Sequence, residues 1–62
     1  MERIDLTIYP TKNQVSLIKS NPKIQRAMVE SKSWHSLKKK ILSLVIASDD
    51  ALTFFEKKFK NN

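Results

Sequence analysis

Residues 33–47 carry the pattern that most constrains the fold of this chain. Apolar side chains recur there with the three- and four-residue spacing of one helix face, at Trp34, Leu37, Ile41, Leu44 and Val45. Such a stripe predicts an amphipathic helix that buries this face. Because Leu42 and Ile46 widen the stripe, we expect this helix to lie at the centre of the core, with Trp34 as one of its anchors.

Residues that favour helix starts divide the rest of the chain. Thr11 and Gln14 have the spacing of a capping box, in which the Thr hydroxyl and the Gln side chain satisfy free amides reciprocally. Asn21 is a favoured N-cap, and Pro22 suits the first helical position. Ser48 precedes two acidic residues, which is typical of a helix first turn. The expected helices are therefore about 11–19, 22–31, 33–47 and 49–60. The alternative is a single helix that runs through residue 48 into the last segment.

The last expected helix has an aromatic face and a basic end. Leu52, Phe55 and Phe59 share one face, with Phe54 beside it. We expect the three Phe side chains to lie in the core. If one of them is exposed, it would mark a protein interface.

The N-terminal segment alternates with a period of two. Ile4, Leu6 and Ile8 alternate with polar residues, which predicts a half-buried strand at about 3–9, and Pro10 ends it. No other segment alternates in this way, and the chain has no Asn-Gly or Asp-Gly turn. The strand is therefore expected to lack a partner within the chain. It would pair with a second copy or with another protein, or form a short ordered arm.

The segment Arg3-Ile4-Asp5-Leu6-Thr7-Ile8, followed by helices, resembles the ribbon-helix-helix repressors. The resemblance implies a dimer in which two antiparallel copies of the strand form a ribbon above the helices. It also implies that the exposed face of this ribbon contacts DNA, through Arg3, Asp5, Thr7 and Tyr9.

Length and composition limit the fold and the chemistry. The 62 residues contain no Cys and no Gly, which excludes disulfides, thiolate metal sites and glycine-rich phosphate loops. We expect one small, mostly α-helical domain over residues 1–62, with a strand and three or four helices. A second copy, joined through the strand, would add stability to a chain of this size. No apolar segment is long enough to span a membrane. We expect a cytoplasmic protein.

Positive charge is concentrated around the central helix. The net charge is +6, and residues 31–48 carry four lysines and no acidic residue. We predict a small DNA-binding protein or transcriptional regulator, in which these lysines and two arginines contact the phosphates of the nucleic acid. The predicted site comprises Lys32, Lys38, Lys39, Lys40, Arg26 and Arg3. With only two Arg in the chain, backbone contacts are favoured over base readout.

The same features are compatible with other functions. A charged helix face often serves solubility alone. The chain could instead be an inhibitor, antitoxin or accessory factor that docks on a larger acidic protein through its strand edge or an apolar face. No catalytic pair, metal cluster or cofactor motif is apparent, and His35 is expected to be a surface residue. We therefore expect a protein that is not an enzyme and has no cofactor.

Overall fold

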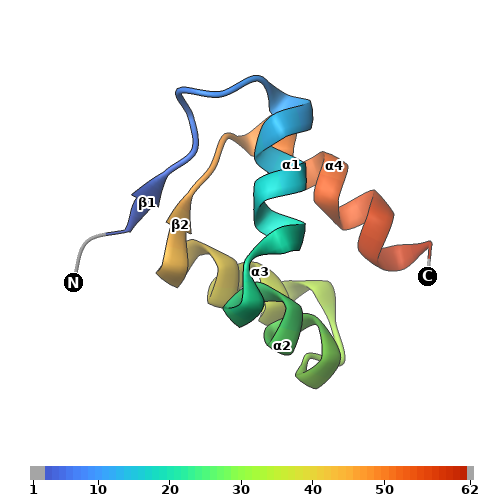
Figure 1. The fold of residues 1–62 in the computed structure, drawn as a ribbon. Coiled ribbons are helices and arrows are strands. Elements are labelled where there is room, and N and C mark those ends of the chain that lie inside the picture. The colour runs from blue at the N-terminus through green and yellow to red at the C-terminus, as the bar shows by residue number, and fades with distance from the viewer. Residues whose placement is uncertain (1–2, 62) are drawn as a thin grey trace.

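The computed structural model describes residues 3–61 and contains four helices and two very short strands (Figure 1). In chain order they are β1 (Ile4–Asp5), α1 (Thr11–Ser20), α2 (Pro22–Glu30), α3 (Trp34–Leu44), β2 (Val45–Ile46) and α4 (Asp49–Lys60). This confirms a mostly helical single domain with a short N-terminal strand. Residues 1, 2 and 62 of the expected 1–62 domain lie outside the described residues.

Side-chain caps begin three of the helices. The Asn21 Oδ1 atom accepts a hydrogen bond from the Lys23 amide at 2.9 Å, and Pro22 follows as the first residue of α2. The Ser48 Oγ atom accepts from the Ala51 amide at 3.1 Å and begins α4. Ser33 caps α3 with a longer bond of 3.4 Å. These caps satisfy amides that have no partner within their own helix.

The capping box predicted for α1 does not form. Pro10 occupies the N-cap position and makes no side-chain hydrogen bond there, and Thr11 is already the first helical residue. Gln14 is buried, and its side-chain Nε2 atom donates to the Tyr9 carbonyl oxygen at 2.8 Å. The prediction is wrong because Gln14 is on the inward face of α1. There its side-chain amide forms hydrogen bonds with backbone groups outside the helix, instead of with the start of α1.

The partner of β1 lies within the chain. β1 pairs in parallel with β2, with Ile4 opposite Val45 and Asp5 opposite Ile46. The Leu6 amide extends the pairing by donating to the Ile46 carbonyl oxygen at 2.7 Å. The expectation of a strand at 3–9 without an internal partner is therefore wrong. Two residues per strand are too few to give a periodic signal in the sequence.

The central helix ends earlier than predicted. α3 stops at Leu44, and Val45 and Ile46 adopt extended backbone and pair with β1. Both residues are β-branched, which favours a strand over a helix. The predicted helix 33–47 was therefore too long at its C-terminal end, because it included the two residues of β2. The alternative of one helix through residue 48 is also wrong.

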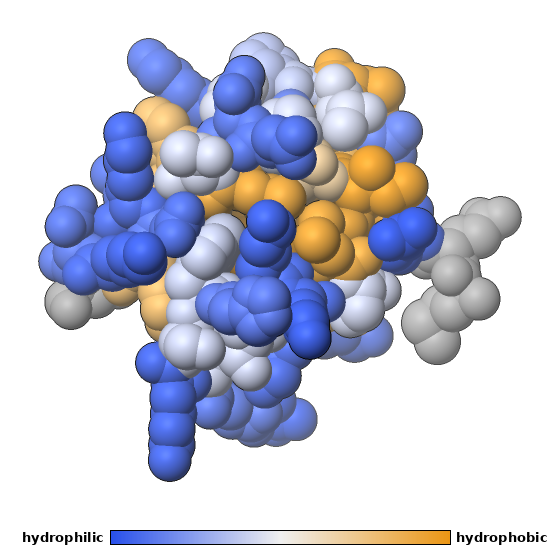
Figure 2. All heavy atoms as spheres, turned by 180° about the vertical axis from the view of Figure 1, so that it is seen from behind, coloured by the Kyte–Doolittle hydropathy of each residue, from blue (hydrophilic) through white to orange (hydrophobic). Residues whose placement is uncertain are grey.

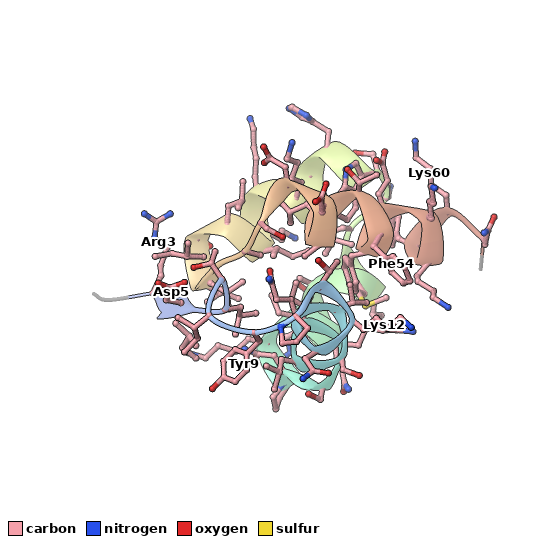
Figure 3. All side chains as sticks on the ribbon, turned by 90° about the horizontal axis from the view of Figure 1, so that it is seen from above. Arg3, Asp5, Tyr9, Lys12, Phe54 and Lys60 are labelled. Atoms are coloured by element: carbon pink, nitrogen blue, oxygen red, sulfur yellow. The ribbon has the colours of Figure 1, made fainter. Side chains whose placement is uncertain are left out.

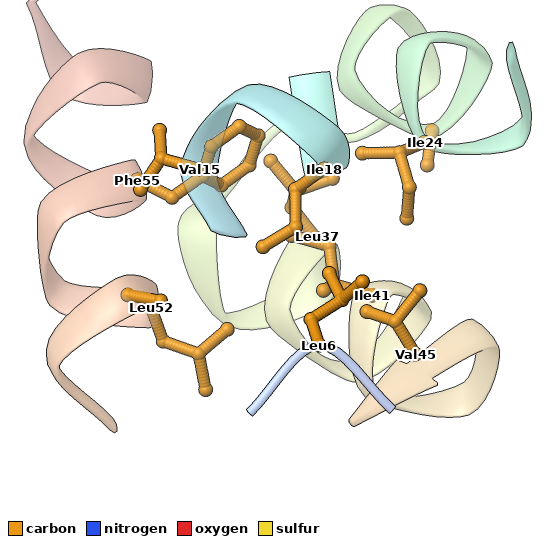
Figure 4. Packing of buried hydrophobic residues seen from close by; sticks show 11 residues of the cluster. Leu6, Val15, Ile18, Ile24, Leu37, Ile41, Val45, Leu52 and Phe55 are labelled. Carbon is orange, nitrogen blue, oxygen red and sulfur yellow. The ribbon is translucent and has the colours of Figure 1, made fainter. Parts of the chain in front are cut away.

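The hydrophobic core is formed by all four helices, Leu6 and β2 (Figure 4). Phe55, Ile18, Ile24, Leu37, Ile41 and Val45 are its largest fully buried side chains. Trp34 is half-buried and packs on this core, with its ring centroid 5.8 Å from that of Phe55 and 6.1 Å from that of Phe59. The prediction of Trp34 as a core anchor agrees with this packing.

Only part of the predicted apolar faces is covered. Leu6 is buried, whereas Ile4 and Ile8 are 59% and 76% exposed, so the predicted inward face of the N-terminal strand is wrong. Phe54 is 40% exposed, which corrects its expected place in the core. Figure 2 shows apolar surface gathered near the N-terminal end of the described chain. Ile46, which is 39% exposed, lies in the same two-stranded sheet as Ile4.

Candidate functional site

The three consecutive lysines of α3 do not form one cluster. Lys38, Lys39 and Lys40 are all exposed, but successive residues of an α-helix point about 100° apart. The buried residues Leu37 and Ile41 define the inward direction of α3. Relative to them, Lys39 points away from the core, while Lys38 and Lys40 project from opposite flanks.

Lys38 lies close to negative charge. It lines a hollow of about 310 Å³ between α3 and α4, together with Trp34, Leu52, Thr53 and the two acidic residues Asp49 and Glu56. Neither carboxylate forms an ion pair with Lys38, but both add negative potential around it, which weakens its attraction for an anion. The structure therefore makes Lys39, rather than Lys38, the stronger candidate for contact with an anionic ligand.

Folding places Arg3 at the end of α3. The Arg3 Nη1 atom donates a hydrogen bond of 2.9 Å to the carbonyl oxygen of Leu42, 39 residues away in the sequence. A cation at this end complements the partial negative charge of the last helical carbonyls. Figure 3 shows Arg3 beside this end of α3. The positively charged Arg3 guanidinium therefore lies against the same helix that carries Lys39.

The remaining predicted residues lie elsewhere. Arg26 is on α2, where it lines a shallow hollow with Pro22 and Lys23. Lys32 is exposed in the connection between α2 and α3. The hollow that Arg26 lines includes no lysine of α3. The structure therefore groups Arg3 with α3 and leaves Arg26 on a separate surface.

Most of the positive charge is not neutralised by ion pairs. Within the described part of the chain, the ion pair between Lys60 and Glu56, with atoms 2.9 Å apart, is the only one. The other basic side chains in that part are exposed and available to an anionic ligand. Exposed amines of this kind give binding that weakens as salt screens them.

Asp5 is an acidic residue near Arg3. Its Oδ1 atom accepts hydrogen bonds from the hydroxyl and from the backbone amide of Thr7, the latter at 2.9 Å. The hydroxyl bond, followed by the amide bond, lowers the pKa of the Asp5 carboxyl below its ordinary value. Asp5 therefore stays ionised at neutral pH, and a bound polyanion must avoid it.

A second basic surface was not singled out from the sequence. Phe54, Lys57, Lys58 and Asn61 line a hollow of about 200 Å³ on the C-terminal half of α4. The Lys58 Nζ atom lies 5.9 Å from the centroid of the Phe54 ring. The four-residue spacing of Phe54 and Lys58 places them on one side of the helix and was visible in the sequence. The sequence could not show that this side is left uncovered.

Other kinds of site are not found in the described residues. Between residues 3 and 61, no three His, Asp or Glu side chains gather closely enough to hold a metal ion. None of the helices described is both long and apolar enough to cross a lipid bilayer. No protein-family model, curated protein or solved structure matches this chain.

Proposed function

We propose that this protein binds the phosphate backbone of nucleic acid through the outer side of α3. The observation that carries the proposal is the hydrogen bond from Arg3 to the Leu42 carbonyl oxygen, which adds a guanidinium to the helix of Lys39. We name Arg3 and Lys39 the α3 basic face. Lys38 and Lys40 project from its two flanks, and α3 itself contains no acidic residue.

The composition of this face favours binding without sequence preference. Lysine ammonium groups are compact charges that pair with phosphate oxygens, whereas Arg is the commoner reader of base edges. Each phosphate that is neutralised releases counterions, so that affinity falls steeply as salt increases. The expected complex is therefore salt-sensitive and similar for unrelated duplex sequences.

The test is a titration of fluorescein-labelled random duplex DNA with the protein at two salt concentrations, followed by anisotropy. We expect binding at low salt that is lost as salt rises. We expect Lys39→Glu to weaken it about tenfold or more, because it removes one phosphate contact and adds a repelling charge. We expect Lys38→Glu to have a smaller effect, because Asp49 and Glu56 already weaken the attraction of Lys38 for an anion.

Lys12→Glu is the matched control. It makes the same change in net charge at an exposed position in the first turn of α1, on the other side of the molecule from Arg3 (Figure 3). If Lys12→Glu and Lys39→Glu weaken binding equally, the α3 basic face is not the site. Absence of binding at low salt would reject nucleic acid as the ligand.

A second candidate function is docking on another protein through β1. The Leu6 amide is directed to β2, and backbone groups alternate along a strand, so those of Asp5 point to the outer, unpaired edge. Ile4 and Ile8 are exposed near this edge. Such an edge can add a strand from a partner or from a second copy.

Measurement of mass in solution and partner capture separate these possibilities. A dimer mass that returns to the monomer value in Ile8→Asp would indicate a second copy. A captured protein that is retained by Lys39→Glu but lost by Ile8→Asp would indicate a different partner. If Ile8→Asp changes neither result, docking through this edge is rejected.

A further inference from the structure

The hollow at the end of α4 combines an aromatic surface with positive charge. Phe54 is 40% exposed, and Lys57, Lys58 and Asn61 surround the hollow that it lines. The volume of about 200 Å³ is below the ~300–1,000 Å³ of typical small-molecule sites. It can take a single apolar side chain of a larger ligand.

The charge around this hollow excludes a basic occupant. Among the described residues, those that line it include two lysines and no acid. Glu56 is on another side of α4, where its carboxylate pairs with Lys60. Lys12, from the first turn of α1, projects on the same side of the molecule as Phe54 (Figure 3). A second copy of this chain, with its net charge of +6, would bring like charges together there.

The position of Lys58 favours a peptide over a stacked base. Its ammonium nitrogen lies 5.9 Å from the Phe54 ring centroid, in a cation–π arrangement over the ring. A base that stacks on Phe54 needs this ring face to be open. An apolar side chain of a peptide can instead contact the exposed part of the ring. A neighbouring carboxylate of the same peptide can then pair with Lys58 while Lys58 stays over the ring.

We propose that this hollow docks an acidic segment of another protein, with one apolar side chain on Phe54 and carboxylates on Lys57 and Lys58. Aromatic side chains such as Phe are enriched in protein interfaces, and the rim around the interface core is polar, which is where Lys57 and Lys58 would pair with carboxylates. Figure 3 shows Phe54 and Arg3 at opposite ends of the molecule. The residues that line the hollow come from α4 and Asn61 alone, so this docking surface shares no residue with the α3 basic face.

The test is a selection from a displayed library of random twelve-residue peptides on the folded protein. We expect enriched peptides to have one apolar residue flanked by Asp or Glu. The best of them, synthesised with a fluorescent label, should bind at least tenfold more weakly to Phe54→Ser and to Lys58→Glu. The Lys58→Glu variant keeps the proposal testable if Phe54→Ser fails to fold.

Two control variants make the comparison specific. Val29→Ser removes an apolar side chain that is 87% exposed on α2, and Lys39→Glu changes the charge of α3. Neither should alter peptide binding, and Phe54→Ser should not alter duplex DNA binding. These readouts separate failure of this proposal from failure of the nucleic-acid proposal.

Three outcomes would overturn the assignment. The first is a selection that enriches no peptides, or enriches neutral or basic ones. The second is peptide binding that Phe54→Ser and Lys58→Glu leave unchanged. The third is binding of a twelve-residue oligothymidylate that Phe54→Ser weakens as strongly as we expect it to weaken peptide binding. That result would assign the hollow to base stacking.

Discussion

Gln14 connects two segments that are far apart in the sequence. Its Nε2 atom donates to the Tyr9 carbonyl oxygen at 2.8 Å, and its Oε1 atom accepts from the Ser48 amide at 3.0 Å. The side chain is 3% exposed, and a buried amide is tolerated in a core when its donor and its acceptor are both used. Gln14 therefore fixes the start of α1 against the start of α4.

Removal of this amide should destabilise the protein. We expect Gln14→Ala to lower the free energy of unfolding by about 1–3 kcal/mol, because the Ser48 amide loses its partner at a site that water reaches poorly. Urea unfolding followed by Trp34 fluorescence measures the change, since Trp34 packs on Phe55 and Phe59.

Gln25→Ala is the control for this prediction. Gln25 also donates its Nε2 to a backbone carbonyl, that of Lys19, at 2.8 Å, but at an exposed position. Water can replace that bond, so we expect a loss below about 1 kcal/mol. Equal losses in the two variants would show that burial of the Gln14 amide is not what stabilises this junction.

At the scale of the element, α4 shows how local charge and capping set a helix. Ser48 caps its first turn, where Asp49 and Asp50 also lie. Three lysines occupy its last turn. Acidic residues at the start and basic residues at the end both complement the helix dipole. The ion pair from Glu56 to Lys60 adds an i, i+4 contact on the surface, of small energy.

The Ser48 cap should make a measurable contribution to stability. We expect Ser48→Ala to lower stability by about 0.5–2 kcal/mol, because the Ala51 amide loses its acceptor. In a domain of this size, each 1 kcal/mol corresponds to roughly 4–8 °C in Tm. Thermal unfolding by circular dichroism should therefore show a decrease of several degrees.

Ser43→Ala is the matched substitution within a helix. The Ser43 hydroxyl donates to the Lys40 carbonyl oxygen at 2.8 Å, and the residue is exposed in α3. Alanine is the better helix former, so we expect Tm to stay the same or rise slightly. A Tm decrease as large as that of Ser48→Ala would rule out capping as the cause.

At the scale of the whole molecule, stability depends on one core shared by every helix. Leu6 and Val45 reach this core from segments that are far apart in the sequence, and Ile18, Leu37 and Phe55 are fully buried in it. A single core in a chain of this length provides only about 3–5 kcal/mol of net stability. Loss of one central side chain can therefore use up most of that stability.

Leu37→Ala tests this dependence. Replacement of a buried Leu by Ala costs about 2–5 kcal/mol, so we expect a largely unfolded protein at 25 °C, with weak helical circular dichroism. Leu17→Ala is the control, because Leu17 is 41% exposed in the middle of α1, and it should remain folded. A Leu37→Ala protein that melts within a few degrees of Leu17→Ala would contradict a shared core.

The sequence by itself determined where the helices of this protein lie and how three of them begin. The apolar stripe that contains Leu37 and Ile41, and the start signals at Asn21 and Ser48, act over one or two helical turns. Such signals depend only on residues that are close in the chain, so they can be recognised without the fold. The excess of positive charge around α3 could also be counted from the sequence.

Tertiary structure alone decided which of these residues meet. Val45 and Ile46 became a strand because β1 offered backbone partners from more than 40 positions away. Long-range contacts also explain two other residues. Arg3 lies against α3 because it bonds to the Leu42 carbonyl, and Gln14 is buried between α1 and α4, instead of capping α1, because it bonds to the Ser48 amide. The exposure of Phe54 follows from how α4 packs on its neighbours. Each of these outcomes depends on contacts between distant segments, which no local pattern in the sequence records.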